Sequence, residues 1–383
     1  MRIAFDAKRI YQNRTGLGNY SRTLVSSLAK YFPEHEYLLF APKKTDLYDH
    51  TPFDNITDHL PQSSLHKILK SAWRSKWVIA DLQKNNVDIY HGLSHEIPFG
   101  IEKTNIKSVV TIHDLIFEKY PEQFSTIDVQ IYRKKFINAC KNANAIIAIS
   151  EQTKQDIVSL YGIHPNKIHV CYQSCNEAFG VMLTEAQQKI IQNKYRLPDR
   201  FLLSVGSIIE RKNLLNVCKA ISLIPENERL PLIVIGDGDR YKQTAKKYIH
   251  ENDLSEWIVF LSEDERAKQS PEFRNGKDLP GIFQLATAML YPSIYEGFGI
   301  PVLEALMSKT PVITSNVSCL PEAGGDAAFY VDPFNPSSIA TAINNIMNDN
   351  SLTKNMITKG IEHAKNFTQE KCATAIMNVY KNL

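Results

Sequence analysis

The stretch "AMLYPSIYEGFGIPVLEALMSKTPVIT", residues 288–314, decides the fold. It begins with a short apolar run that predicts a strand, Ala288–Tyr291, and ends with a second one, Pro311–Thr314. Between them, a loop over Pro292–Ile300 leads into a predicted helix over Val302–Ser308. A strand, a helix and a strand in this order indicate two parallel strands joined by a crossover helix.

The same alternation runs through both halves of the chain. Nearly continuous Val/Ile/Leu strands separated by helices indicate parallel sheets that are covered on both faces. The alternation breaks near residues 173–200 and resumes at Phe201. We therefore expect two doubly wound α/β domains, residues 1–180 and 190–365, with helices alone over about 337–382. The other predicted strands are Ile3–Phe5, Tyr37–Phe40, Val87–Tyr90, Ser108–Ile112, Ala145–Ile149, Phe201–Val205, Leu232–Ile235 and Trp257–Leu261.

Composition excludes several classes of protein. The 383 residues are 43% hydrophobic and 22% charged, as in ordinary globular proteins, and the net charge of +3 is too small to indicate nucleic-acid binding. No apolar run approaches the roughly 20 residues of a membrane span. The first residues predict a strand and no signal peptide. Six scattered cysteines, with no second pair beside Cys171 and Cys175, indicate reduced thiols in a cytoplasmic protein and no zinc site.

Two glutamates flank the glycine-rich loop of the opening stretch. Seven residues separate Glu296 from Glu304, and Gly297–Ile300 lie between them. Carboxylates accept hydrogen bonds from hydroxyl groups, and exposed backbone amides suit an anion or a sugar. Pro301 is well placed near the start of the helix that carries the second glutamate.

Two adjacent cations follow another predicted strand end. After Gly206 and Ser207 comes Glu210-Arg211-Lys212-Asn213, just before a helix. The positive end of a helix disfavours cations, so these two indicate a bound anion, unless they are a solvated surface pair. Carboxylates for hydroxyl groups and cations for a diphosphate together describe a nucleotide sugar.

Two further segments have both a functional and an ordinary interpretation. Gly16 opens a predicted helix, where its backbone could let an anion approach the helix end. Alternatively, this glycine only forms the turn before the helix. Ser21 stands where a dinucleotide-binding motif would have a third glycine, which argues against NAD binding. His113 ends an apolar strand, where ligands bind in parallel sheets, but the next residue, Asp114, could make both residues part of a helix cap.

Asp237 and Asp239 form an acidic pair directly after a predicted strand. Two such acids could hold a divalent cation beside a diphosphate. Acids in this position also serve as turn residues and helix caps, and we favour the turn.

In this order, the motifs resemble the retaining glycosyltransferases of the GT-B fold, in the large group 1 family of mannosyl- and glucosyltransferases. The resemblance covers nearly the whole chain, and its most specific part is the Glu-x7-Glu motif from Glu296 to Glu304. It implies two Rossmann-like domains facing across a cleft and a C-terminal helix, about 366–383, that crosses back to the first domain. It also implies that no cofactor and no metal are needed.

The resemblance implies a role for each motif residue. Glu304 would bind the ribose of the donor nucleotide, and His113 would face the transferred sugar. Ser207 departs from the many relatives that carry a second arginine there, which places more of the charge on the other cations. Glu296 would contact the donor sugar. The sugar and the phosphates would be contacted by Gly297, Phe298, Gly299 and Ile300. The diphosphate would be bound by Arg211, Lys212 and Gly16, with Gly206 beside them. His113, Glu296, Arg211 and Lys212 would be the catalytic residues.

We therefore expect transfer of a hexose, with retention, from a nucleotide diphosphate sugar to a saccharide or a lipid-linked saccharide. Mannose from GDP-mannose is the preferred donor, because the segment around Arg211 resembles bacterial mannosyltransferases of surface-polysaccharide assembly. A UDP-hexose donor and a catalytically silent nucleotide-sugar-binding protein are the alternatives. A phosphorylase-like enzyme is a further rival, although no lysine is distinctively placed for a pyridoxal cofactor.

Residues 65–79, "LHKILKSAWRSKWVI", combine basic and apolar side chains. As one amphipathic helix, they could lie on the anionic inner surface of the cytoplasmic membrane, beside a lipid-linked acceptor. Alternatively, the apolar side of that helix packs against the N-terminal sheet.

Overall fold

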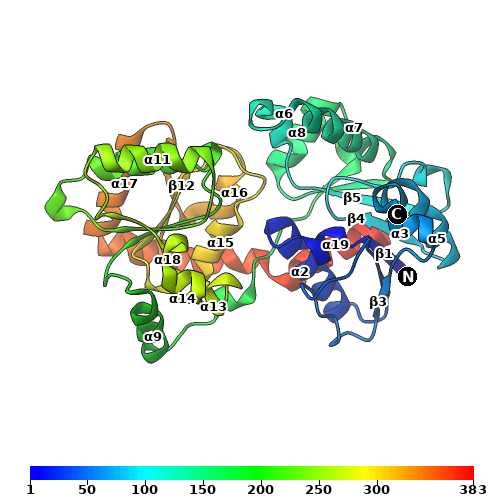
Figure 1. The fold of residues 1–383 in the computed structure, drawn as a ribbon, viewed down its shortest axis with the longest axis horizontal. Helices are drawn as coiled ribbons and strands as arrows, with labels where there is room; N and C mark the ends of the chain where they lie inside the picture. The colour runs from blue at the N-terminus through cyan, green and yellow to red at the C-terminus, as the bar shows by residue number, and fades with distance from the viewer. The chain divides into compact units, whose positions relative to one another are not determined.

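The computed structural model describes residues 1–383 and divides the chain into two units, each built around its own parallel sheet (Figure 1). The first unit comprises Met1–Ser174 and Phe367–Leu383, and the second comprises Cys175–Asn366. The predicted class, two parallel α/β domains in one chain, is confirmed.

The sheet of the first unit has seven strands in the order β3-β2-β1-β4-β5-β6-β7. The order reverses beside β1, which pairs with β2 on one side and β4 on the other. This is the arrangement of a doubly wound fold. The strands are β1 Arg2–Asp6, β2 Glu36–Phe40, β3 Ile56–His59, β4 Ile89–Gly92, β5 Lys107–Ile112, β6 Ala145–Ala148 and β7 Ile168–Val170.

Alternate residues of these strands enter two hydrophobic cores, one on each face of the sheet. Ile3 and Phe5 pack in one core, whereas Ala4, between them, packs in the other. This period of two is the reason why both faces need helices. The first core takes α2 Gly16–Tyr31 and α19 Gln369–Lys381, and the second takes α5 Val78–Lys84, α7 Thr126–Asn142 and α8 Glu151–Tyr161.

The C-terminal helix α19 belongs to the first unit, although the whole second unit precedes it in the chain (Figure 1). It packs against α2, and buried Tyr380 contacts His91 of β4 through a 2.5 Å hydrogen bond between its hydroxyl and Nδ1. The predicted crossing of this helix back to the first domain is confirmed.

The sheet of the second unit has six parallel strands in the order β10-β9-β8-β11-β12-β13. It repeats the reversal of the first sheet, here beside β8, which pairs with β9 and β11. The strands are β8 Leu202–Val205, β9 Leu232–Ile235, β10 Ile258–Phe260, β11 Ala288–Tyr291, β12 Val312–Ser315 and β13 Phe329–Val331.

The stretch that opened the sequence analysis forms β11, helix α15 and β12, as predicted. Helix α15 spans Ile300–Met307, so it begins two residues earlier than expected. Gly299 precedes it with a φ of 106°, a left-handed conformation that glycine adopts without strain, and Pro301 lies in its first turn. Other helices of this unit are α9 Glu185–Tyr195, α10 Leu214–Ser222, α11 Arg240–Glu251, α14 Leu279–Leu285, α17 Pro336–Asn348 and α18 Asn350–Ala364.

The prediction of a single amphipathic helix over residues 65–79 is wrong. The segment is broken at Leu69 into α3 Ser64–Ile68 and α4 Lys70–Ala72, followed by a π-helical turn, Trp73–Trp77. Trp73 is buried in the core, in agreement with the packing interpretation for this half. Three apolar side chains of the first half remain exposed to solvent: Leu65, Ile68 and Leu69.

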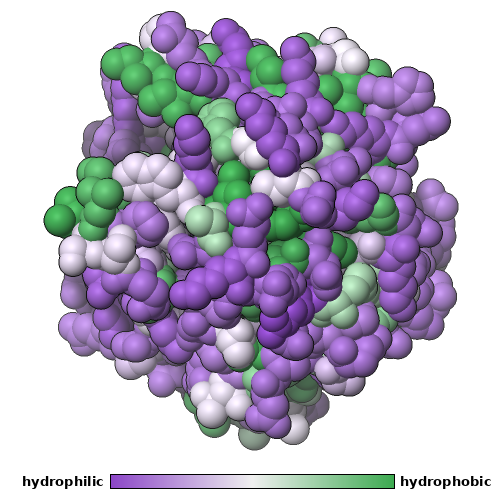
Figure 2. Space-filling view, turned by 90° about the vertical axis from the view of Figure 1, so that its right-hand side faces the viewer, coloured by the Kyte–Doolittle hydropathy of each residue, from purple (hydrophilic) through white to green (hydrophobic).

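The outer surface shown in Figure 2 is mostly hydrophilic, with hydrophobic side chains in separate patches. No helix combines the length and the apolar character that crossing a lipid bilayer requires. All six cysteines are buried free thiols.

Candidate active site

The candidate site of the second unit lies where its strand order reverses. Strands β8 and β11 are neighbours, and the loops after them leave their carboxyl ends. Ligands of doubly wound domains bind at this position because the two loops diverge there and leave a crevice. The first loop carries Arg211 and Lys212 in a 3-10 turn, Glu210–Lys212, and the second carries Glu296.

These three charged side chains form one ion cluster. The Glu296 carboxylate accepts from Lys212 Nζ at 2.6 Å through one oxygen, and Arg211 Nη1 lies 2.9 Å from the other oxygen. Their side chains are only 9%, 19% and 11% exposed, respectively. The alternative of a solvated surface pair is therefore wrong for both cations.

Tyr291, the last residue of β11, completes this cluster. Its hydroxyl accepts a short hydrogen bond from Lys212 Nζ and lies 3.2 Å from a Glu296 oxygen. Burial alone would raise the pKa of Glu296, but Lys212 and Arg211 outweigh burial and hold that pKa below its usual value. The pKa of Lys212 is lowered by burial and by Arg211, against the attraction of Glu296. We call Arg211, Lys212, Tyr291 and Glu296 the Glu296 cluster.

Neighbouring residues fix both loops. Buried Asn213, in a left-handed conformation with a φ of 65°, donates from Nδ2 to the carbonyl oxygens of Pro292 and Pro333 at 3.0 and 2.7 Å. Ser318, just after β12, accepts from the Glu296 amide at 3.2 Å and donates to its carbonyl at 2.8 Å. The backbone on both sides of the cluster is therefore held before any ligand binds.

Glu304 lies on α15 and differs from Glu296 in having no protein partner. Its side chain is partly buried, and no hydrogen bond or ion pair reaches its carboxylate. Burial raises the pKa of this carboxyl to about 7. A desolvated carboxylate without a partner is costly in a folded protein, and such groups are candidates for ligand contacts.

The backbone between the two glutamates approaches the site without large side chains in the way. Phe298 is buried and points into the protein, whereas Gly297 and Ile300 are partly accessible. At the end of β8, Gly206 is partly accessible, with a φ of 139°, and Ser207 is exposed.

The acidic pair after β9 is part of a turn. The Asp237 carboxylate accepts from Lys242 at 2.6 Å, and the Asp237 carbonyl accepts from the Ile208 amide at 2.7 Å. A Cβ atom on Gly236 would lie 1.8 Å from the carbonyl oxygen of Gly206, and one on Gly238 would lie 2.1 Å from that of Ile208. These glycines let the loop after β9 pack against the loop that carries the cations, which agrees with the turn interpretation.

In the first unit, His113 follows β5 and is buried. Its Nε2 is 2.9 Å from the Leu93 carbonyl and its Nδ1 is 2.9 Å from the Gln173 amide nitrogen. A carbonyl only accepts and an amide nitrogen only donates, so the ring is the neutral tautomer protonated on Nε2. Burial lowers the pKa of His113 to about 3, which agrees. The Asp114 carboxylate accepts from the Ile116 amide at 3.1 Å, as a cap residue does.

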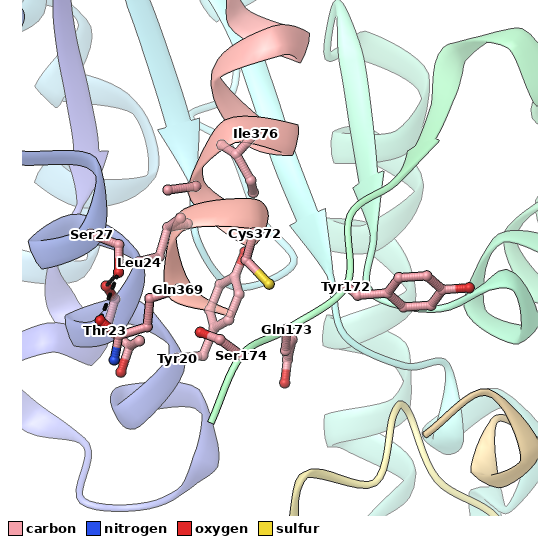
Figure 3. Close-up of a pocket in the computed structure, with 11 residues that line it drawn as sticks. Tyr20, Thr23, Leu24, Ser27, Tyr172, Gln173, Ser174, Gln369, Cys372 and Ile376 are labelled. Carbon is pink, nitrogen blue, oxygen red and sulfur yellow. Dashed lines mark hydrogen bonds between the residues drawn. The ribbon is translucent and has the colours of Figure 1, made fainter. Parts of the chain in front are cut away.

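Gly16 is the exposed first residue of α2, with open space around it, whereas Gly18 is structural: a Cβ atom there would lie 1.9 Å from the Asn13 carbonyl oxygen. A small cavity lies between α2, α19 and residues 172–174, lined by Tyr20 and Gln173 among others (Figure 3). Its volume of about 20 Å³ suits a water molecule and excludes a sugar.

Sequence reasoning named the charged residues of the cluster but missed the groups that support them. Tyr291 was placed only as a strand end, and Asn213 was quoted without a role. Ser318 carries no recognisable pattern. A buried tyrosine at the carboxyl end of a parallel strand and an asparagine closing a tight turn are the two signals that could have been used.

Two family models match the chain, one in each unit. Residues 14–177 match Glycosyltransferase Family 4, and residues 187–363 match Glycosyl transferases group 1. Among curated proteins, the O-antigen chain mannosyltransferase B of Escherichia coli is 28% identical over the whole length of both chains.

Solved structures show the same fold. A glycosyltransferase from Rickettsia africae aligns over 100% of this chain and 98% of its own, with a TM-score of 0.75 and 19% identity. Anabaena HepE, solved in complex with UDP and glucose, aligns over 100% of both chains, with a TM-score of 0.73 and 15% identity. These likenesses establish the GT-B fold. With the two family models covering most of its length, the protein belongs to the group 1 glycosyltransferases.

Proposed function

We propose that this glycosyltransferase moves a hexose from a nucleotide diphosphate sugar to a saccharide or lipid-linked saccharide, with retention at the anomeric carbon. Mannose from GDP-mannose is the preferred donor, and O-antigen-type surface polysaccharide is the preferred product. The full-length likeness to an O-antigen chain mannosyltransferase supports this choice. HepE, solved with UDP and glucose, supports a nucleotide-sugar donor, and UDP-hexoses remain the alternative.

The observation that carries the proposal is the Glu296 cluster at the reversal of the second sheet. Two cations and one carboxylate share a largely buried position, so one positive charge is left for an incoming anion. A donor diphosphate would take hydrogen bonds from Arg211 and Lys212. Glu296 would then be released from part of its ion pairing and could accept hydrogen bonds from the sugar hydroxyls.

Glu304 supplies the contact to the nucleotide. Its carboxylate has no protein partner, and two ribose hydroxyls are donors of the right kind. The amides of Gly297 to Ile300, at the start of α15, would contact sugar and phosphates, where a helix N-terminus favours negative charge. Gly206 and Ser207 would lie beside the diphosphate.

In the proposed reaction, the bond from the anomeric carbon to the diphosphate oxygen breaks, and a bond to the acceptor oxygen forms on the same face of the sugar. The acceptor proton passes to the departing diphosphate. Arg211 and Lys212 stabilise the charge that builds on this leaving group, the work that a metal does in other transferases. We therefore propose that no divalent metal and no cofactor are required.

In the first unit, we propose that Gly16 approaches the diphosphate and that His113 faces the transferred sugar. Gly16 offers open backbone at a helix start. Because His113 is neutral and both of its ring nitrogens are engaged, its proposed role is to shape and position, and it does not exchange a proton with the acceptor.

The test is a transfer assay with the purified protein, a mannose-terminated oligosaccharide, and GDP-mannose or UDP-hexoses in turn. We expect release of GDP and an extended saccharide whose new linkage is α, as in the donor, by NMR of the anomeric centre. A β linkage would contradict retention. Donor binding without transfer or hydrolysis of any nucleotide sugar would favour the silent binding protein.

A further inference from the structure

A charged cavity lies wholly within the first unit, at the carboxyl ends of β1 and β2. Its volume is about 230 Å³, room for a ligand much larger than water. Lys8 follows β1 and Lys43 follows β2, while Lys70 and Arg74 come from the broken segment after α3 and Lys135 comes from α7. Every charged side chain that lines this cavity is positive.

Two of these cations are already neutralised. Buried Arg74 donates from Nε to both oxygens of Asp6, at 2.9 and 2.8 Å, and its Nη2 lies 2.6 Å from Glu96. Lys135 lies 2.9 Å from the other oxygen of Glu96. Burial alone would raise the pKa of Glu96, but Arg74 and Lys135 hold it at about 2, so the carboxylate is ionised. This network forms a rigid, charge-balanced wall.

The other three cations, Lys8, Lys43 and Lys70, form no ion pair. Lys8 is partly buried, and burial together with repulsion from Arg74 and Arg9 lowers its pKa, against the attraction of Glu96 and Asp6. Three unpaired positive charges around one cavity repel one another unless an anion lies between them. The hydroxyl of Ser71 and the amide of Gln12 add neutral hydrogen-bonding groups to the same lining.

We propose that this cavity binds a phosphoryl group of the acceptor, as a phosphate monoester or a diphosphate. A phosphoryl group offers several oxygens and more than one negative charge, which matches three separated ammonium groups better than a single carboxylate does. The inference rests on the proposed transferase function and names the chemical class of its acceptor. The site is distinct from the Glu296 cluster, whose cations have their own carboxylate in the other unit.

The surroundings of Lys70 suit a phosphoryl group that is attached to a lipid. Ile68 is 77% exposed, and Leu65 and Leu69, in the same short segment, are 56% and 46% exposed. Ile68 and Leu69 directly precede Lys70 in the chain, and Leu65 lies one helical turn before Leu69. A hydrocarbon chain next to a bound diphosphate would cover them.

The test measures binding directly by titration calorimetry, with inorganic pyrophosphate as the probe. Every protein in this test carries Arg211→Ala and Lys212→Ala, so that the second unit contributes no anion site. We call the protein with these two substitutions alone the background protein. In this background we expect pyrophosphate to bind, and the triple substitution Lys8→Gln, Lys43→Gln, Lys70→Gln to weaken it at least tenfold. The matched control removes three exposed lysines of the same unit that do not line the cavity: Lys67→Gln, Lys76→Gln and Lys84→Gln.

No binding to the background protein, or an equal loss in the control, would overturn the proposal. Removing repelling charges should keep or raise the Tm, which separates lost binding from lost folding. A titration with farnesyl diphosphate distinguishes a lipid-linked phosphoryl group from a soluble phosphate ester. If farnesyl diphosphate binds at least tenfold more tightly than pyrophosphate, the acceptor is lipid-linked. Equal affinity indicates a soluble phosphate ester at the same site. This binding test does not depend on transferase activity. If it fails while the wild-type protein still transfers a hexose, only the proposal for this cavity is overturned, and the proposed function stands.

Discussion

Replacing Glu304 by glutamine should stabilise the free protein and weaken nucleotide binding at the same time. Burial raises the pKa of this carboxyl from 4.5 to about 7. The folded protein thus holds the proton more tightly than the unfolded chain does, and stability falls as the pH rises from 4.5 through 7. Above pH 7, the full cost of the buried charge is present.

The size of the effect follows from the shift. At about 1.4 kcal/mol for each pH unit, the cost at pH 8 is at most about 3.5 kcal/mol, and partial solvent access reduces it to about 1–3 kcal/mol. Glutamine has nearly the same shape and no charge, so Glu304→Gln should recover this free energy. For a domain of this size, the Tm should rise by about 2–4 °C per kcal/mol at pH 8, with little change at pH 5.

Binding should move in the opposite direction. If the ionised carboxylate accepts hydrogen bonds from the ribose, its loss should weaken GDP binding about 10- to 100-fold, the usual value of a hydrogen bond to a charged group. For the wild type, affinity should increase as the pH rises through 7, because the bound form needs the ionised carboxylate.

Scanning calorimetry at pH 5 and pH 8 measures the change in Tm, and GDP titrations at pH 8 measure the change in affinity. Glu256→Gln, an exposed glutamate of the same unit, is the matched control and should change neither quantity. A lower Tm at pH 8, or GDP affinity within twofold of the wild type, would refute the account of Glu304.

The remaining predictions test the cluster and its supports. Arg211→Ala and Lys212→Ala should each lower kcat about 100- to 1,000-fold, because each removes charge from the site of the leaving group. Turnover should persist in excess EDTA, and Asp239→Asn should cost little; activity that EDTA abolishes and magnesium restores would contradict the metal-free proposal. Gly236→Ala should lower the free energy of unfolding by about 3 kcal/mol or more, since the new Cβ would meet a carbonyl oxygen at 1.8 Å. Gly276→Ala, with a φ of 78° and open space, should cost only about 1 kcal/mol in the same denaturant titration.

Ten of the thirteen strands were predicted, because buried parallel strands leave continuous apolar runs, as Leu232–Ile235 shows. The short strands β3, β7 and β13 were missed. Residues 65–79 were not predicted correctly, because the spacing of their apolar residues fits one helix. The backbone breaks at Leu69, and Arg74, in the following π-helical turn, points inward to Asp6 and Glu96. These tertiary ion pairs have no signature in the segment itself.

For the site, residue types and order predicted Arg211, Lys212 and Glu296 as functional, but not that they would contact one another. That contact depends on the pairing of β8 with β11, two strands far apart in the sequence. The contrast between Glu296, with two cations, and Glu304, with none, also comes from tertiary packing. The spacing of seven residues does not reveal how the surroundings of the two glutamates differ in the fold.

The central claim is that the second unit holds a nucleotide diphosphate sugar between the Glu296 cluster and Glu304. A crystal structure of the protein with GDP-mannose tests it most directly. We expect the ribose hydroxyls within about 2.7–3.2 Å of the Glu304 carboxylate and the diphosphate oxygens on Arg211 and Lys212. A nucleotide whose ribose lies away from Glu304, or a diphosphate that leaves both cations bonded to Glu296 alone, would contradict the claim.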